Sequence, residues 1–138
     1  MTSRLILLVN ESNAEEEKVI RLCLNHVAGW NVVSISSKYK ELSLLLKNQP
    51  DAIIINALLT NINGLSSNQT GLIHNLKKHP VTQSSPILLL IDTANWLTTV
   101  QFKTWRIAGA IVKPFDPITL PLQIMSMLGW NEPQERLM

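Results

Sequence analysis

Uninterrupted apolar runs alternate along this chain with longer segments whose apolar residues recur at helical spacing. The runs at 4–9, 52–56 and 86–91 predict strands that are buried on both faces, as in a parallel sheet. Shorter runs predict further strands at 31–36 and 110–112. The pattern therefore predicts five strands separated by helices.

The first predicted helix has the clearest ends. Asn13 suits the N-cap, Glu16 stands three residues later as in a capping box, and Gly29 ends the apolar stripe. Further helices are predicted at 39–48, 69–78 and 95–107.

The last predicted helix begins after Pro114 and ends at Gly129. Either Asp116 or Thr119 could cap it, because both residue types accept hydrogen bonds from the first turn. Pro121 is tolerated only in a first turn, which favours Thr119.

Strands that alternate with helices of this length form βαβ units with right-handed crossovers. The sequence therefore predicts an α/β fold, with a doubly wound five-stranded parallel sheet of order 2-1-3-4-5 between two helical layers. We expect a single domain over residues 1–130 and a short polar tail over 131–138.

Composition narrows the function classes. The net charge of +2 is spread over scattered basic residues, so no nucleic-acid partner is expected. The single Cys23 excludes an internal disulfide and fits a reducing, cytoplasmic compartment. No apolar run is long enough for a membrane span, and no signal peptide is recognisable.

The chemistry is expected at the carboxyl ends of the first and third strands, where the predicted sheet reverses its strand order. Asn10 and Glu11 follow the first strand, and Asn56 ends the third. Asn56 is also explicable as a simple polar cap at a strand end.

Several segments together resemble the receiver domain of two-component response regulators. They are Leu-Leu-Val-Asn-Glu at 7–11, Pro-Asp-Ala-Ile-Ile-Ile-Asn at 50–56, Asn-Gly at 63–64 and Lys-Pro-Phe-Asp-Pro at 113–117. The resemblance covers about residues 4–129 and implies a flavodoxin-like receiver fold. It also implies a phosphoacceptor Asp, an acidic pair that holds Mg²⁺, a Ser or Thr after the fourth strand and a Lys after the fifth.

This chain departs from that pattern at most of those positions. The acidic pair falls on Asn10 and Glu11, and the phosphoacceptor position falls on Asn56. The hydroxyl position falls on Ile91, and only Lys113 is retained. The resemblance therefore implies a degenerate pseudo-receiver pocket.

The switch position, which is aromatic in the family, falls on Ala110. An amide is a far poorer nucleophile than a carboxylate, so Asn56 is not expected to accept a phosphoryl group. Mg²⁺ prefers anionic oxygen ligands, and Glu11 alone offers at most a weak site. No cofactor and no enzymatic activity are expected, and Lys113 is expected to pair with Glu11.

Function is then expected to rest on protein–protein contact within a phosphorelay, with a histidine kinase or another regulator as partner. A homodimer through the face of the fourth helix, fifth strand and last helix is a further expectation. Candidate interface residues are Trp96, Trp105, Leu122, Met125 and Leu128. A slightly oversized core is the alternative explanation of these apolar residues.

A small-ligand module of the flavodoxin type is the alternative function, because it shares the strand order. It would need a phosphate-binding loop rich in Gly, Ser or Thr after the first strand. This chain has Asn-Glu-Ser-Asn there, and the three glutamates at 15–17 that follow would repel phosphate.

Overall fold

The computed structural model describes residues 3–10, 14–36, 47–57, 59–60, 64–65, 67–91 and 106–130. Five strands form one parallel sheet of order β2-β1-β3-β6-β7, which confirms the predicted order. Its strands are β1 (Leu5–Val9), β2 (Asn31–Ile35), β3 (Ala52–Asn56), β6 (Ile87–Ile91) and β7 (Gly109–Val112).

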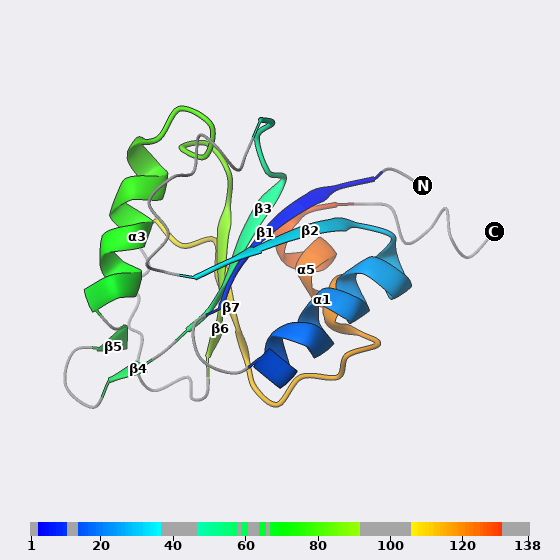
Figure 1. Cartoon of the computed structure of the whole chain (residues 1–138). Helices are drawn as coiled ribbons and strands as arrows, with labels where there is room; N and C mark the ends of the chain where they lie inside the picture. The colour runs from blue at the N-terminus through cyan, green and yellow to red at the C-terminus, as the bar shows by residue number, and fades with distance from the viewer. Residues whose placement is uncertain are drawn as a thin grey trace.

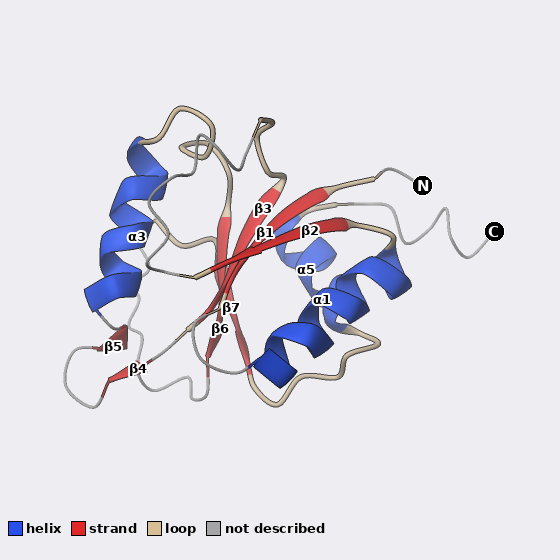
Figure 2. Cartoon of the chain, in the orientation of Figure 1, coloured by secondary structure: helices blue, strands red, loops and turns tan. Residues whose placement is uncertain are grey.

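The described helices cover both faces of this sheet (Figure 1). Helix α3 (Ser67–Lys78) packs on one face, and α1 (Ala14–Ala28) and α5 (Leu120–Leu128) lie side by side on the other. Figure 2 separates the three layers by secondary structure. None of the described helices combines the length and the apolar composition needed to cross a bilayer.

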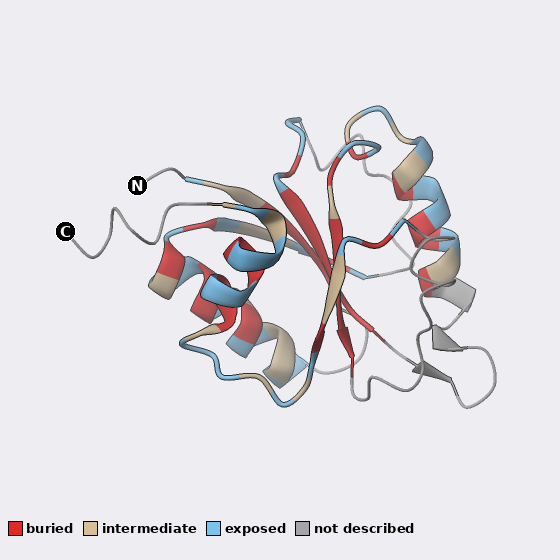
Figure 3. Ribbon diagram, turned by 180° about the vertical axis from the view of Figure 1, so that it is seen from behind, coloured by how far each residue is buried: buried red, intermediate tan, exposed pale blue. Residues whose placement is uncertain are grey.

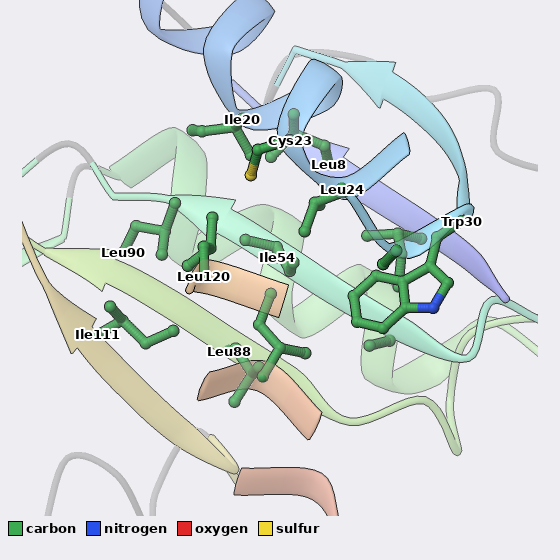
Figure 4. Close-up of a cluster of buried hydrophobic side chains, with 14 of the residues drawn as sticks. Leu8, Ile20, Cys23, Leu24, Trp30, Ile54, Leu88, Leu90, Ile111 and Leu120 are labelled. Atoms are coloured by element: carbon green, nitrogen blue, oxygen red, sulfur yellow. The ribbon is translucent and has the colours of Figure 1, made fainter. Parts of the chain in front are cut away.

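The core is divided by the sheet because successive strand residues point to opposite faces. In β3, Ile53 and Ile55 join the cluster beneath α3, whereas Ile54 joins the cluster beneath α1 and α5. Every residue of β3 and β6 is buried (Figure 3). Figure 4 shows the second cluster, in which Ile20 and Cys23 of α1 face Leu90 and Leu120 across the layer.

Burial explains why these segments form these elements. Removing a Leu or Ile side chain from water contributes about 1.5–3 kcal/mol, and β3 and β6 do so on both faces. Cys23 is buried in the core, and burial raises the pKa of its thiol to about 11.

The strand bounds agree with the predicted ones to within one residue. The structure also contains a feature that the sequence did not predict. The loop after β3 includes an antiparallel pair of short strands, β4 (Leu59–Thr60) and β5 (Gly64–Leu65). The prediction that a helix extends to Ile107 is wrong, since Ile107 is a buried, non-helical residue just before β7. The predicted helix at 39–48 and the rest of that at 95–107 lie almost wholly outside the described residues.

The ends of α5 confirm the preferred cap. Thr119 is the N-cap residue, without a side-chain capping bond, and Pro121 lies in the first turn. Gly129 closes the helix with φ 72°, a left-handed conformation that suits glycine. The backbone N–H of Trp130 then donates to the Met125 carbonyl at 2.8 Å, which brings Trp130 to the amino edge of the sheet.

Three side chains meet at that amino edge. Trp30, just before β2, is fully buried, and its ring meets the Trp130 ring edge-on with centroids 5.4 Å apart. The guanidinium of Arg4, just before β1, lies 3.9 Å from the centroid of the Trp130 ring. The residues that precede two strands are thus joined to Trp130, which follows the Gly129 cap of α5.

Candidate functional site

Polar side chains converge at the opposite, carboxyl edge of the sheet. Asn10 follows β1, Asn56 ends β3 and Lys113 follows β7. Since the strands are parallel, these three positions lie at one edge. The strand ends predicted this place for Asn10 and Asn56, and the resemblance implied it for Lys113. A fourth side chain, Glu16, reaches the same place from the start of α1.

Asn56 is hydrogen-bonded on both sides of its amide. Its Nδ2 donates to Asn10 Oδ1 and to Glu16 Oε1, each at 2.6 Å. Its Oδ1 accepts from Lys113 Nζ at 2.8 Å. An amide suits this position because its nitrogen donates to Asn10 and Glu16 while its oxygen accepts from Lys113.

The backbone of Asn56 is engaged as well. The buried Gln69, near the start of α3, donates through Nε2 to the Asn56 carbonyl oxygen at 3.0 Å. Asn56 is a buried residue, 8% exposed, and it connects the ends of β1 and β7 with α1 and α3.

Glu16 was not among the residues assigned to the site from sequence, where it was interpreted as part of a capping box. The predicted cap, Asn13, lies outside the described residues. A signal was nevertheless present, because the first turn of a helix that follows a parallel strand lies above the carboxyl edge of the sheet. An acidic first turn in that position could have indicated a site carboxylate.

The electrostatics of Glu16 follow from its neighbours. Partial burial raises the pKa of the Glu16 carboxyl group. The hydrogen bonds from Asn56 and Lys113 and the charge of Lys113 lower this pKa, and together they outweigh the effect of burial. The pKa therefore lies below its usual range, and Glu16 is ionised at neutral pH.

Lys113 is held from both ends. Its backbone N–H donates to the Ile91 carbonyl at 2.7 Å, and the peptide bond to Pro114 is cis. Its ammonium lies 3.2 Å from Glu16 Oε1, and its side chain is only 13% exposed. The expected partner Glu11 lies outside the described residues, and within them Glu16 is a carboxylate partner of Lys113.

The two remaining pocket positions are apolar and packed. Ile91 is 2% exposed and belongs to the cluster beneath α3. Ala110, the expected switch position, is half-buried and packs against the same cluster.

The structure separates the candidate interface residues. Met125 is 1% exposed and lies in the core beneath α1 and α5, so its assignment to an interface is corrected: it faces the sheet. Leu128 is half-buried against that core, whereas Leu122 is 45% exposed. Trp96 and Trp105 lie outside the described residues.

Leu122 borders a depression of about 480 Å³ between β7 and α5. Met127, which lines the same depression, is also exposed, as is Val112 at the end of β7. No residue of α5 carries a charge, so this surface is apolar with a few uncharged polar groups.

The resemblance implies Mg²⁺ at the carboxyl edge, and the described donors do not fit it. Mg²⁺ is held through one or two carboxylates, but Glu16 Oε1 already accepts from Asn56 and Lys113. The amide oxygen of Asn56, another candidate metal ligand, already accepts a hydrogen bond from the Lys113 ammonium. Within the described part of the chain, no three His, Cys, Asp or Glu side chains group as metal ligands.

Comparison with solved structures gives consistent matches, although no protein-family model matches the sequence. A putative response regulator from Chloroflexus aurantiacus J-10-fl is 24% identical, with a TM-score of 0.69 over 93% of this chain and 99% of that one. The chemotaxis response regulator CheY4 of Vibrio cholerae is 21% identical, with a TM-score of 0.71 over 91% and 99% of the two chains.

A third match is the receiver domain of the sensor histidine kinase PA1611 from Pseudomonas aeruginosa PAO1, which holds a magnesium ion in its active-site cleft. It is 20% identical, with a TM-score of 0.66 over 93% of this chain and 99% of that one. The chain thus has the fold of response-regulator receiver domains, in agreement with the sequence prediction.

Proposed function

We propose that this chain is a receiver-like regulator of two-component signalling that acts through protein contact and does not accept a phosphoryl group. The observation that carries the proposal is the chemical identity and hydrogen bonding of Asn56. The residue at the phosphoacceptor position is a neutral amide whose oxygen and nitrogen both bond to neighbouring side chains. An acyl phosphate forms by attack of a carboxylate oxygen, which Asn56 lacks.

Two further observations support the proposal. The buried Ile91 side chain has no hydroxyl with which to bond a phosphoryl oxygen. Ala110 provides no aromatic ring whose reorientation could report on the pocket. A ligand shifts a conformational equilibrium only through contacts that differ between the two states.

The test of this part is direct labelling. Treatment with acetyl phosphate and Mg²⁺, or with a histidine kinase from the same cell, is expected to leave the protein without an acyl phosphate. Stoichiometric, Mg²⁺-dependent labelling that hydroxylamine removes would overturn the proposal.

The contact surface that we propose is the apolar face formed by β7 and α5, with Leu122 and Met127 at its centre. Exposed apolar residues that gather on one face commonly mark protein interfaces, and methionine adapts well to a partner. The partner would be a histidine kinase, another regulator or a second copy of this chain.

Charge substitutions on this surface test it. Leu122→Glu and Met127→Glu should abolish self-association or partner capture and leave the fold intact, because both side chains are exposed. Leu22→Glu on α1 is the matched control, since Leu22 is an exposed apolar residue on a different helix. Sedimentation velocity and affinity capture from the native cell are the measurements. Equal loss of binding in all three variants would contradict the assignment.

A further inference from the structure

One oxygen atom in the polar site has an unusual set of neighbours. Glu16 Oε1 accepts a hydrogen bond from Asn56 Nδ2 at 2.6 Å and another from Lys113 Nζ at 3.2 Å. The two donors come from the end of β3 and from the residue after β7, which are 57 residues apart. Convergent amide and ammonium donors are the groups that bind a small oxyanion.

These donors are held in place independently of Glu16. Asn56 is the last residue of a fully buried strand, and its Nδ2 is also bonded to Asn10. Lys113 is tied through its backbone to Ile91, and its Nζ also bonds to Asn56 Oδ1. The two donors therefore remain oriented toward one point.

The carboxylate at that point belongs to the protein itself. Glu16 is the third residue of α1, a helix of 15 residues whose positive end adds to the attraction for an anion. Its side chain is 31% exposed, so the position that it occupies is partly open to solvent.

We infer that Asn56 and Lys113 form a preformed oxyanion-binding site, and that the Glu16 carboxylate occupies it as a built-in, autoinhibitory ligand. The inference rests on the proposed function in one respect, namely that the pocket is not used for phosphoryl transfer. It adds a reason for that loss: the position of an incoming oxyanion is taken by a group of the same chemistry.

A tethered ligand competes strongly with free ones. A group on a short tether has an effective concentration of the order of millimolar or higher at its binding site. A free ion must therefore reach a similar concentration before it displaces the tethered group. The intact protein should therefore exclude small oxyanions, and removal of the Glu16 carboxylate should create a site for them.

The test is a titration of Glu16→Ala with inorganic phosphate and with acetate, at an ionic strength kept constant with chloride. The side-chain amide signals of Asn56 in ¹H–¹⁵N NMR spectra report on the site. We expect saturable shifts with a millimolar Kd in Glu16→Ala, and affinity at least tenfold weaker in the intact protein. Acetate should also raise the Tm of this variant more than chloride does.

Glu15→Ala is the matched control, because Glu15 is an exposed glutamate in the same helical turn. It should exclude oxyanions as the intact protein does. The double variant Glu16→Ala with Lys113→Met should lose the new site, since the cationic donor is gone. Glu16→Ser, which suits the first turn of a helix, is made in parallel to provide a second folded variant.

Two results would overturn the inference: equal phosphate affinity in the intact protein and in Glu16→Ala, or no saturable binding in a folded Glu16→Ala or Glu16→Ser variant. Neither result would affect the proposed function, which is tested separately by acyl-phosphate formation in the intact protein and by partner binding of the Leu122 and Met127 variants.

Discussion

The two edges of the sheet are closed in different ways. At the carboxyl edge, Asn56 connects Asn10, Glu16 and Lys113 through short hydrogen bonds. At the amino edge, Trp30 packs edge-on against Trp130. One edge is closed by polar groups that satisfy one another and the other by aromatic surface.

The difference shows which edge contributes stability. A buried ion pair offsets much of its attraction by the cost of desolvating both charges, so its net contribution is small. Burial of the Trp30 side chain desolvates only one uncharged indole N–H, which costs less than the desolvation of two charges. We therefore expect truncation at the amino edge to cost most, and charge changes at the carboxyl edge to cost less while changing what the pocket can bind.

The largest effect is expected from Trp30→Ala, which should lower the free energy of unfolding by about 3–5 kcal/mol, because it empties a fully buried site. Urea denaturation followed by circular dichroism measures it. Trp30→Phe is the control: it keeps an aromatic ring and removes an indole N–H that has no hydrogen-bond partner in the described structure. A loss in the control as large as that in Trp30→Ala would contradict this account.

The next effect is expected from Asn56→Asp. The substitution replaces a donor by an acceptor 2.6 Å from both Glu16 Oε1 and Asn10 Oδ1, and should cost about 2–3 kcal/mol at neutral pH. Adding Glu16→Gln should recover much of the loss, because one of the two facing carboxylates becomes a neutral amide. Urea denaturation of the single and double variants tests this coupling, and strictly additive losses would refute it.

Asn56→Asp is also expected not to restore a working switch. With Mg²⁺ and beryllofluoride, NMR shifts should stay close to residue 56, because Ile91 and Ala110 supply neither a hydroxyl nor an aromatic ring. Shifts of equal size along β7 would show that a switch is intact.

A smaller effect is expected from pH. The pKa of Glu16 in the folded protein lies below its ordinary value of 4.5. Above pH 4.5 the carboxylate is ionised in both states and its full stabilisation is present. As the pH falls from there through the folded-state pKa, the unfolded chain binds the proton first and that stabilisation is lost. The stability difference between the intact protein and Glu16→Gln should therefore shrink in acid, and a constant difference would contradict the assignment.

The smallest effect is expected from Arg4→Ala at the amino edge. A partly exposed cation above an aromatic ring contributes about 0.5–1 kcal/mol. Arg4→Lys keeps the charge and should lose less. A loss that approaches that of Trp30→Ala would mean that Arg4 orders the whole edge, and the contrast between the edges would need revision.

The sequence predicted the site only in part, and particular residues explain why. Asn10 and Asn56 could be placed together because each ends or follows a strand, and parallel strands end at one edge. Lys113 was added through the resemblance to receiver domains. Glu16 could not, because its pattern fits a helix cap equally well. Met125 and Leu122 are both apolar residues of one nearly uncharged helix, so composition could not separate the core residue from the exposed one.

The sequence by itself determined the order of the sheet strands and of the described helices, the five-stranded parallel sheet and the absence of a carboxylate at position 56. These follow from apolar periodicity and residue identity, which are local properties. Only the tertiary structure decided that Glu16 enters the site and that Met125 faces the sheet. Each depends on how a helix is rotated and placed against the sheet, and that is set by packing between segments far apart in the chain.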